Sequence, residues 1–203
     1  MTTQEAIETA MAELSSMSES AKLDAQLLVC HARNIEQTKL VTHPEQELSN
    51  EEQALFRSTL ARRSQGEPFA YIVGEKEFWS LAFIVNRHVL IPRPETELLV
   101  EIVLDAISEK QSLHILDLGT GSGAIAISIA KERMDCAFVA TDISEASLEV
   151  AKLNAAKHNV EITFIHSDWY QNIHREKFDA IVCNPPYVAE DDPYLQQYVT
   201  EYE

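Results

Sequence analysis

The sequence is poor in glycine, cysteine and positive charge. Its 203 residues include five glycines and three cysteines, and 16 basic side chains stand against 33 acidic ones, giving a formal net charge of -17. Surfaces that bind nucleic acid or anionic membranes need clustered lysine and arginine, so this balance argues against both as general partners. Cys30, Cys136 and Cys183 have no metal-ligand spacing, which predicts reduced core thiols and no metal site.

Long apolar runs and targeting signals are also missing. The N-terminal stretch MTTQEAIETAMAEL is acidic and has no signal-peptide core. No apolar run approaches the length of a membrane span. Hydrophobic residues nevertheless make up 45% of the chain. We therefore expect a cytoplasmic protein without membrane attachment, built as one large domain or two small ones.

The front of the chain predicts helices. Thr2 with Glu5 and Ser49 with Glu52 have the spacing of capping boxes, in which a hydroxyl and a carboxylate satisfy the free N–H groups of a first helical turn. Ser20 is expected to cap a further helix between them. This part has no alternation of strands and helices and few candidate catalytic residues, so we expect a small helical domain.

The chain changes character after the helical front. Residues 75–86 are rich in strand formers around Ser80 and predict a β-hairpin. Pro92 and Pro94 exclude a helix at their own positions, and the apolar spacing over residues 98–107 predicts an amphipathic helix after them.

From Leu113 onward, short apolar strands alternate with helices. This alternation predicts an α/β fold with a parallel sheet covered on both faces, in which ligands bind beyond the carboxyl ends of the strands. The expected strands are residues 113–119, 136–142, 161–168 and 178–184, and the expected helices between them include 122–133 and 144–159.

A glycine loop, DLGTGSGA, closes the first of these strands. Gly119, Gly121 and Gly123 are three of the five glycines in the chain, and glycine lets the backbone turn with positive φ or approach a ligand closely. The loop is not a phosphate-binding P-loop, because no Gly-Lys-Ser/Thr follows, and it differs from the dinucleotide pattern G-x-G-x-x-G. A purely structural tight turn is the alternative.

The next two strand ends add the parts of a nucleoside pocket. Asp142 follows the loop by about twenty residues, where an acid is expected to bind ribose hydroxyls. Asp168 is a candidate acceptor for an adenine amino group, and Trp169 either packs on the ring or is an ordinary core aromatic. Acids without a phosphate-binding lysine suit S-adenosylmethionine, whose sulfonium is a cation, and NAD is the second candidate.

The fourth strand ends in Asn184, Pro185, Pro186 and Tyr187. Asn184 offers a side-chain carbonyl, and Pro185 offers a backbone carbonyl without an N–H. Pro186 holds that backbone extended, so two rigid acceptors are expected to receive both hydrogens of a planar –NH2 group. The hydrogen bonds to these acceptors become stronger as positive charge develops on the nitrogen, so they favour attack of the nitrogen on a methyl sulfonium. Tyr187 is placed to stack on the flat group. A structural Pro-Pro turn is the alternative.

Asn-Pro-Pro-Tyr with DLGTGSG resembles the methyltransferases that act on planar nitrogens, and IPRPETE at residues 91–97 and NPPYV…DDPYL narrow the resemblance to the HemK/PrmC family. These enzymes methylate the Gly-Gly-Gln glutamine of bacterial peptide chain release factors. The resemblance implies a Rossmann-like class I methyltransferase domain over residues 91–203, after a helical substrate-docking domain at 1–70 and a hairpin linker at 71–90. It also implies release factors as protein partners and no direct contact with nucleic acid.

The resemblance also assigns roles to the candidate residues. Those expected to contact S-adenosylmethionine are Gly119, Thr120, Gly121, Ser122, Gly123, Asp142, Asp168, Trp169 and Asn184. Asn184, Pro185, Pro186 and Tyr187 are expected to hold the glutamine amide, with Asn184, Pro185 and Tyr187 taking the catalytic roles. Arg93 and Glu95 are expected to line the mouth of the site, with a salt-bridged loop as their alternative reading.

The chain departs from this family at its end. The family fold continues with further helices and three more strands, whereas this sequence stops at Glu203. We expect a truncated chain with an exposed sheet edge, which is unstable, dimeric or inactive by itself. Two other functions remain open: an adenine or guanine amino-methyltransferase of nucleic acid, which the net charge disfavours, and an inactive fragment that only binds its partner.

Overall fold

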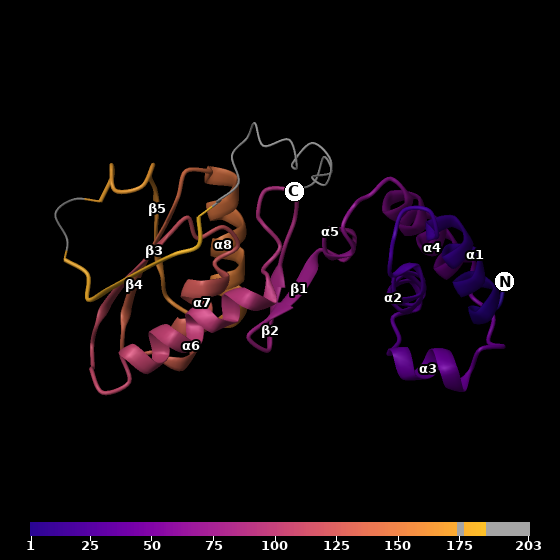
Figure 1. The fold of residues 1–203 in the computed structure, drawn as a ribbon, viewed down its shortest axis with the longest axis horizontal. Helices are drawn as coiled ribbons and strands as arrows, with labels where there is room; N and C mark the ends of the chain where they lie inside the picture. The colour runs from indigo at the N-terminus through magenta and orange to yellow at the C-terminus, as the bar shows by residue number, and fades with distance from the viewer. Residues whose placement is uncertain (174–176, 186–203) are drawn as a thin grey trace. The chain divides into compact units, whose positions relative to one another are not determined.

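The structure is a computed structural model that describes residues 1–173 and 177–185. The chain divides into two compact units, residues 1–73 and the part that begins at Gly74 (Figure 1). Each unit has its own hydrophobic core, one built around Leu14, Leu28 and Phe56 and the other around Phe83 and Ile115. The two units are therefore described separately.

The first unit is helical, as predicted. Thr2 Oγ1 accepts a hydrogen bond from the Glu5 N–H at 3.2 Å while the Glu5 carboxylate accepts from the Thr2 N–H at 2.8 Å, and Ser49 and Glu52 form the same box. Ser20 is the N-cap residue of the helix that begins at Ala21, as predicted, but its side chain makes no capping hydrogen bond and its hydroxyl lies 3.2 Å from that of Ser18. The helices are α1 (Thr3–Leu14), α2 (Ala21–Arg33), α3 (Gln37–Thr42), α4 (Asn50–Ser64) and α5 (Phe69–Val73).

The second unit begins with the expected hairpin, in which β1 (Glu75–Phe78) pairs antiparallel with β2 (Leu81–Ile84). Its two turn residues, Trp79 and Ser80, both have positive φ, at 53° and 55°. Such hairpin turns match the twist of the strands but normally carry glycine or asparagine. The Trp79 N–H donates to Glu97 Oε1 at 2.8 Å, which ties this turn to the next helix.

A short 3-10 turn, η1 (Pro94–Thr96), leads into helix α6 (Glu97–Ala106). The expectation that both prolines exclude helical structure was wrong for Pro94. Proline suits the first position of a helix because the missing N–H has no partner there and its φ is already helical.

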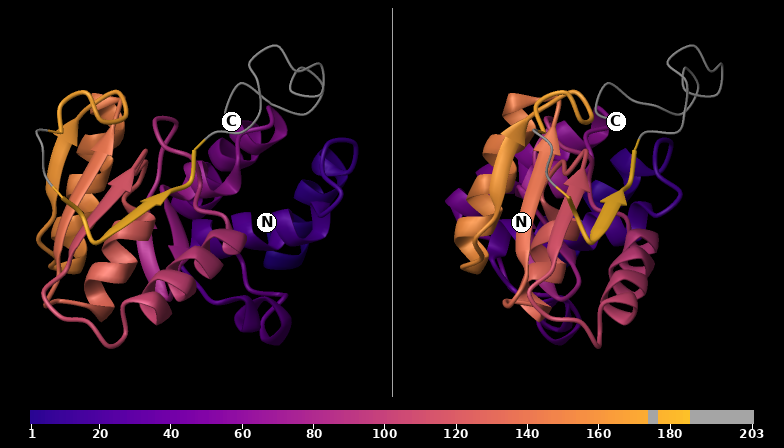
Figure 2. Two further views of the ribbon diagram at one scale, coloured as in Figure 1. Left: turned by 60° about the vertical axis from the view of Figure 1, so that its left-hand side comes forward. Right: turned by 90° about the vertical axis from the view of Figure 1, so that its left-hand side faces the viewer.

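The remaining elements build a parallel sheet, as predicted, and its strand order is β5-β4-β3-β6 (Figure 2). Helix α7 packs between α6 and α8, and Ile115, Leu116 and Ile127 are completely buried in this region. Ser144 caps α8 through the Ser147 N–H at 3.2 Å. The elements are β3 (His114–Leu118), α7 (Ala124–Glu132), β4 (Ala137–Asp142), α8 (Glu145–His158), β5 (Thr163–His166) and β6 (Ala180–Cys183).

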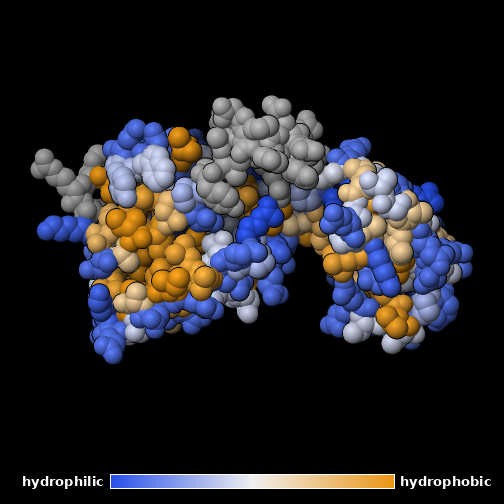
Figure 3. All heavy atoms as spheres, viewed as in Figure 1, coloured by the Kyte–Doolittle hydropathy of each residue, from blue (hydrophilic) through white to orange (hydrophobic). Residues whose placement is uncertain are grey.

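Part of the second unit exposes apolar side chains. Leu98 and Ile102 lie one helical turn apart on α6 and are 60% and 55% exposed, and Ile181 on the neighbouring strand β6 is 51% exposed. Figure 3 shows the apolar surface over this region. Within the described residues, β6 is one of the two edge strands of the sheet, and β5 is the other.

Within the described part of the chain, no helix combines the length and apolar character needed to span a membrane. No group of three or more histidine, cysteine, aspartate or glutamate side chains in those residues is arranged to hold a metal ion. Cys30 is buried, whereas Cys136 and Cys183 are partly exposed, so only Cys30 matches the prediction of core thiols.

Candidate active site

The predicted site residues follow strands whose carboxyl ends meet at one edge of the sheet. Strand β3 lies between β4 and β6, and Leu118 at its end is level with Thr141 on one side and Cys183 on the other. The next residue of each strand is therefore Gly119, Asp142 and Asn184. Strand order alone brings the glycine loop, the predicted ribose acid and the predicted acceptor-binding asparagine together.

The three loop glycines all have positive φ, between 54° and 82°, but for two different reasons. A Cβ added to Gly119 or Gly121 would meet nothing within 4 Å, so their missing side chains leave room for a ligand. A Cβ on Gly123 would lie 2.7 Å from the Ile127 side chain and 3.3 Å from Ala151 Cβ, so this glycine allows α7 and α8 to pack against the loop.

Hydrogen bonds to β4 hold the loop in place. The Thr120 N–H donates to the Thr141 carbonyl at 2.8 Å, and the Gly121 N–H donates to Asp142 Oδ2 at 2.9 Å. Asp142 Oδ1 accepts from the Ser144 N–H at 2.9 Å. Each carboxylate oxygen has a second lone pair, so Asp142 braces the loop and still has acceptor capacity for ribose hydroxyls.

Asp117 is a buried acid directly below the loop, and our interpretation of the sequence missed it. The side chain is 1% exposed, and Oδ2 accepts from the Thr120 hydroxyl at 2.7 Å. Burial raises the pKa of Asp117 to about 6, and the charge of Asp142 adds to this increase. The signal in the sequence was an acid within the apolar strand ILDLG.

A cavity of about 70 Å³ lies between the loop and the segment that follows the hairpin. Most small-molecule sites are larger, at about 300–1,000 Å³, so this cavity can enclose only one end of a ligand. Predicted residues that line it are Gly119, Thr120, Gly121, Ser122, Arg93 and Asn184, and further lining residues are Phe78, Leu90, Pro92, Thr96, Ala124 and Ile125.

Other predicted residues lie outside the lining of this cavity. Glu95 and Pro185 are exposed, and Gly123 and Asp142 support the loop from behind. Pro186 and Tyr187 lie outside the described residues.

Thr96 contacts the predicted catalytic asparagine and was also missed from the sequence. Asn184 Nδ2 donates to Thr96 Oγ1 at 3.3 Å, and the Asn184 side chain is half-buried. This bond uses the donor end of the carboxamide, so the carbonyl oxygen is the end that remains to accept from a ligand. Thr96 belongs to the stretch IPRPETE, in which only Arg93 and Glu95 had been singled out.

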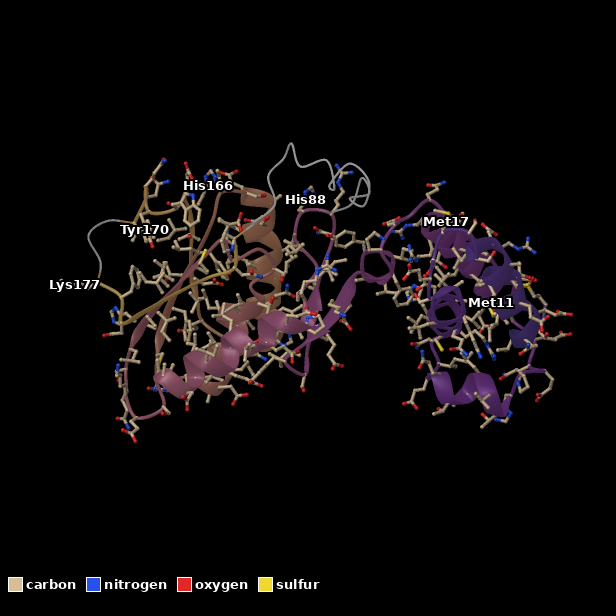
Figure 4. All side chains as sticks on the ribbon, viewed as in Figure 1. Met11, Met17, His88, His166, Tyr170 and Lys177 are labelled. Atoms are coloured by element: carbon tan, nitrogen blue, oxygen red, sulfur yellow. The ribbon has the colours of Figure 1, made fainter. Side chains whose placement is uncertain are left out.

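The predicted adenine side of the site is open. Trp169 is 56% exposed and has a φ of 49°, which excludes the alternative that it is a core aromatic. Asp168 is exposed and accepts from Gln171 Nε2 at 2.9 Å. Figure 4 shows His166 and Tyr170 near the same end of the sheet.

The chemistry of these groups fits S-adenosylmethionine. Two acids, Asp117 and Asp142, lie at the glycine loop, and Asp142 keeps acceptor capacity beyond the two backbone N–H groups that it binds. Such a site suits a ligand that carries positive charge and N–H or O–H donors. Arg93 is the only lysine or arginine among the residues that line the described cavity, so the loop does not resemble a phosphate site.

Comparison with known proteins agrees with this chemistry. The methyltransferase small domain family matches residues 94–200, and the PrmC N-terminal domain family matches residues 5–74. A release factor glutamine methyltransferase from Coxiella burnetii is 44% identical over 91% of this chain and 67% of its own length, and one from Shewanella oneidensis is 45% identical over 95% and 68%. The chain belongs to the release factor glutamine methyltransferase family.

Family membership confirms the resemblance seen in the sequence, and with it the class I methyltransferase fold and S-adenosylmethionine as the cofactor. The alternative cofactor NAD is thereby set aside. Among solved structures, an S-adenosylmethionine-dependent methyltransferase from Geobacter sulfurreducens, in complex with S-adenosylhomocysteine, is 27% identical with a TM-score of 0.38, over 45% of this chain and 36% of the other.

Proposed function

We propose that this methyltransferase transfers a methyl group from S-adenosylmethionine to the side-chain nitrogen of the glutamine in the Gly-Gly-Gln motif of peptide chain release factors. The observation that carries the proposal is the position of Asn184, which follows β6 beside the glycine loop and has its carboxamide nitrogen bound to Thr96. The names of the similar proteins from Coxiella and Shewanella support the same substrate.

The proposed acceptor site binds a planar –NH2 group through carbonyl oxygens. The Asn184 side chain and the Pro185 backbone supply these acceptors, and Pro186 and Tyr187 are proposed to fix and stack the amide. An amide nitrogen is a weak nucleophile because its lone pair is delocalised. Acceptors that strengthen as this nitrogen becomes positive lower the barrier to attack, and S-adenosylmethionine supplies an electrophilic methyl group.

The cofactor is proposed to lie along the carboxyl ends of β3, β4 and β5. Gly119 and Gly121 leave the space for its close approach, with Thr120, Ser122 and Gly123 completing the loop. Asp142 is proposed to accept from the ribose hydroxyls. Asp168 and Trp169 are proposed to contact the adenine, where their exposure leaves them accessible to a ligand.

The helical front, residues 1–70, is proposed to dock the release factor, followed by a linker at 71–90 and the methyltransferase part at 91–203. The match of residues 5–74 to the PrmC N-terminal domain supports a separate front domain. Arg93 and Glu95, both exposed at the start of η1, are proposed to line the mouth through which the glutamine enters.

A methyl-transfer assay with radiolabelled S-adenosylmethionine tests the proposal. The substrates are an unmethylated release factor, the same factor with the motif glutamine replaced by alanine, and bulk RNA and DNA. We expect label only in the intact release factor and a loss of about 100-fold with Asn184→Ala, since removing one transition-state acceptor has effects of this size. Label in nucleic acid with none in protein would favour the amino-methyltransferase of nucleic acid and overturn the proposal.

A further inference from the structure

One face of α8 connects the glycine loop with the segment after the hairpin. Ser147, Ala151, Asn154 and His158 recur every three or four residues, so they lie on the same side of the helix. The Ser147 hydroxyl donates to the His88 carbonyl at 2.7 Å, and His158 Nε2 is 3.0 Å from the Ala82 carbonyl. Figure 4 marks His88 in this segment.

Asn154 lies in the middle of this face and is completely buried. Its Oδ1 accepts from the Ile84 N–H at 2.7 Å, and its Nδ2 donates to the Ile84 carbonyl at 2.9 Å and to the Ser122 carbonyl at 2.9 Å. Both hydrogens of the amide are therefore used, and they bind backbone groups of two segments that are far apart in the sequence. A buried amide with this many partners specifies one arrangement of its surroundings.

On the loop side, the contact is close because of Gly123. A Cβ at this position would lie 3.3 Å from Ala151 Cβ, one helical turn before Asn154. The backbone of the loop thus rests directly on α8, and the Ser122 carbonyl is held by the Asn154 amide. Ser122 itself is 3% exposed and lines the site cavity.

On the other side, Ile84 ends β2 and leads into the wall of the same cavity. Leu90, Pro92 and Arg93 line the cavity from this segment, and Thr96 at its end binds Asn184. The side chain of Asn154 therefore joins the two walls between which the proposed methyl transfer takes place, although Asn154 does not itself line the cavity.

We propose that Asn154 is a positioning residue that holds the glycine loop against the cavity wall that carries Thr96. The affinity of the site for the cofactor then depends on Asn154 although its side chain does not contact the cofactor. The inference rests on the cofactor site in the proposed function. Leucine at this position fills a similar volume but makes none of the three hydrogen bonds, and it leaves the Ser122 carbonyl free to shift.

Isothermal titration of the whole chain with S-adenosylhomocysteine tests the inference. The variants are Asn154→Leu and, as a matched control on the same helix face, Ser147→Ala, which loses a bond to the wall but none to the loop. We expect Asn154→Leu to weaken binding about tenfold, as for loss of a buried hydrogen bond, and Ser147→Ala to change it less than about threefold. Equal dissociation constants for Asn154→Leu and the unaltered chain would overturn the inference.

A measurement on the unaltered chain covers the case in which Asn154→Leu does not fold. The side-chain amide resonance of Asn154 in nitrogen-15 spectra is expected to shift when S-adenosylhomocysteine binds, while that of Asn50 in the first unit stays in place. A saturated chain in which the Asn154 resonance does not move would overturn the inference alone. An unaltered chain that binds no S-adenosylhomocysteine would overturn both the inference and the proposed cofactor site.

Discussion

The carboxamide nitrogen of Asn184 lies 3.3 Å from the hydroxyl oxygen of Thr96. This bond joins the end of β6 to the short turn before α6, two segments 88 residues apart. The protein therefore binds the nitrogen end of the Asn184 carboxamide, and the oxygen end is left for a ligand. The proposed acceptor chemistry requires the oxygen end to remain for the substrate, so the orientation of Asn184 is a property that Thr96 can control.

Replacing Thr96 tests this control. We expect Thr96→Val to lower kcat about tenfold, because the methyl-bearing side chain keeps its shape but the carboxamide is no longer oriented. The dissociation constant for S-adenosylhomocysteine should stay unchanged. Thr96→Ser keeps the hydroxyl and should retain most of the activity. Equal kcat values for Thr96→Val and Thr96→Ser would show that the hydroxyl has no such role.

The buried Asp117 predicts a pH dependence of stability. The pKa of this carboxyl is about 6 in the folded chain and 3.8 as its ordinary value, so the folded state holds the proton at pH values where the unfolded chain releases it. Its stabilising contribution is complete below the unfolded pKa and is lost as the pH rises through 6. Between pH 5 and pH 7.5 this loss is on the order of 1 kcal/mol.

Urea unfolding of the chain and of Asp117→Asn at both pH values measures this contribution. The asparagine does not titrate, so the difference in unfolding free energy between the two proteins should change by roughly 1 kcal/mol in favour of the variant as the pH rises. Other groups titrate equally in both and cancel. A difference that is the same at both pH values would contradict the raised pKa of Asp117.

The hairpin turn predicts a stabilising substitution. Ser80 is exposed and has a φ of 55°, a conformation that costs a residue with a Cβ roughly 1–2 kcal/mol. We expect Ser80→Gly to be about 1 kcal/mol more stable to unfolding than Ser80→Ala, which keeps the Cβ. Thermal unfolding followed by circular dichroism compares them, and equal stability would show that the turn is not strained.

Asp142 should matter more for cofactor binding than Asp168. The Asp142 carboxylate accepts two backbone N–H groups, one of them from the glycine loop, whereas Asp168 is exposed. In Asp142→Asn one of these N–H groups faces an –NH2 donor, so S-adenosylhomocysteine affinity should fall by about ten- to a hundredfold. Asp168→Asn should have a smaller effect by titration calorimetry. The reverse order would place the main anchor at Asp168.

Local sequence patterns predicted the features that depend on neighbouring residues, namely the helix caps and the ends of the strands. Both capping boxes follow from residues three apart, and strand order placed Asn184 beside Gly119 because adjacent parallel strands end at the same edge. Ser20 occupies the predicted N-cap position, but its hydroxyl pairs with that of Ser18 and not with the helix backbone, a competition that spacing alone does not reveal.

The residues that support the site were not predictable in the same way. Asn154 and Thr96 act through partners 32 to 88 residues away, so their roles exist only once α8 and η1 are packed in place. Asp117 was visible as an acid in an apolar strand, but its raised pKa follows from burial, which only the packed structure reveals. The predicted roles of Pro186 and Tyr187 stay predictions, because both lie outside the described residues.

Peptide mass spectrometry of a release factor shows directly whether this methyltransferase modifies the motif glutamine. An unmethylated release factor is incubated with S-adenosylmethionine and either this chain or its Asn184→Ala variant, and the peptide with the Gly-Gly-Gln motif is then sequenced. We expect one added methyl group on the motif glutamine from this chain or, where it is inactive by itself as the sequence predicts, from a chain extended to the length of its relatives, and very little from the Asn184→Ala variant of the same chain. A methyl group on another residue, or an equal amount of product with Asn184→Ala, would contradict the proposed function.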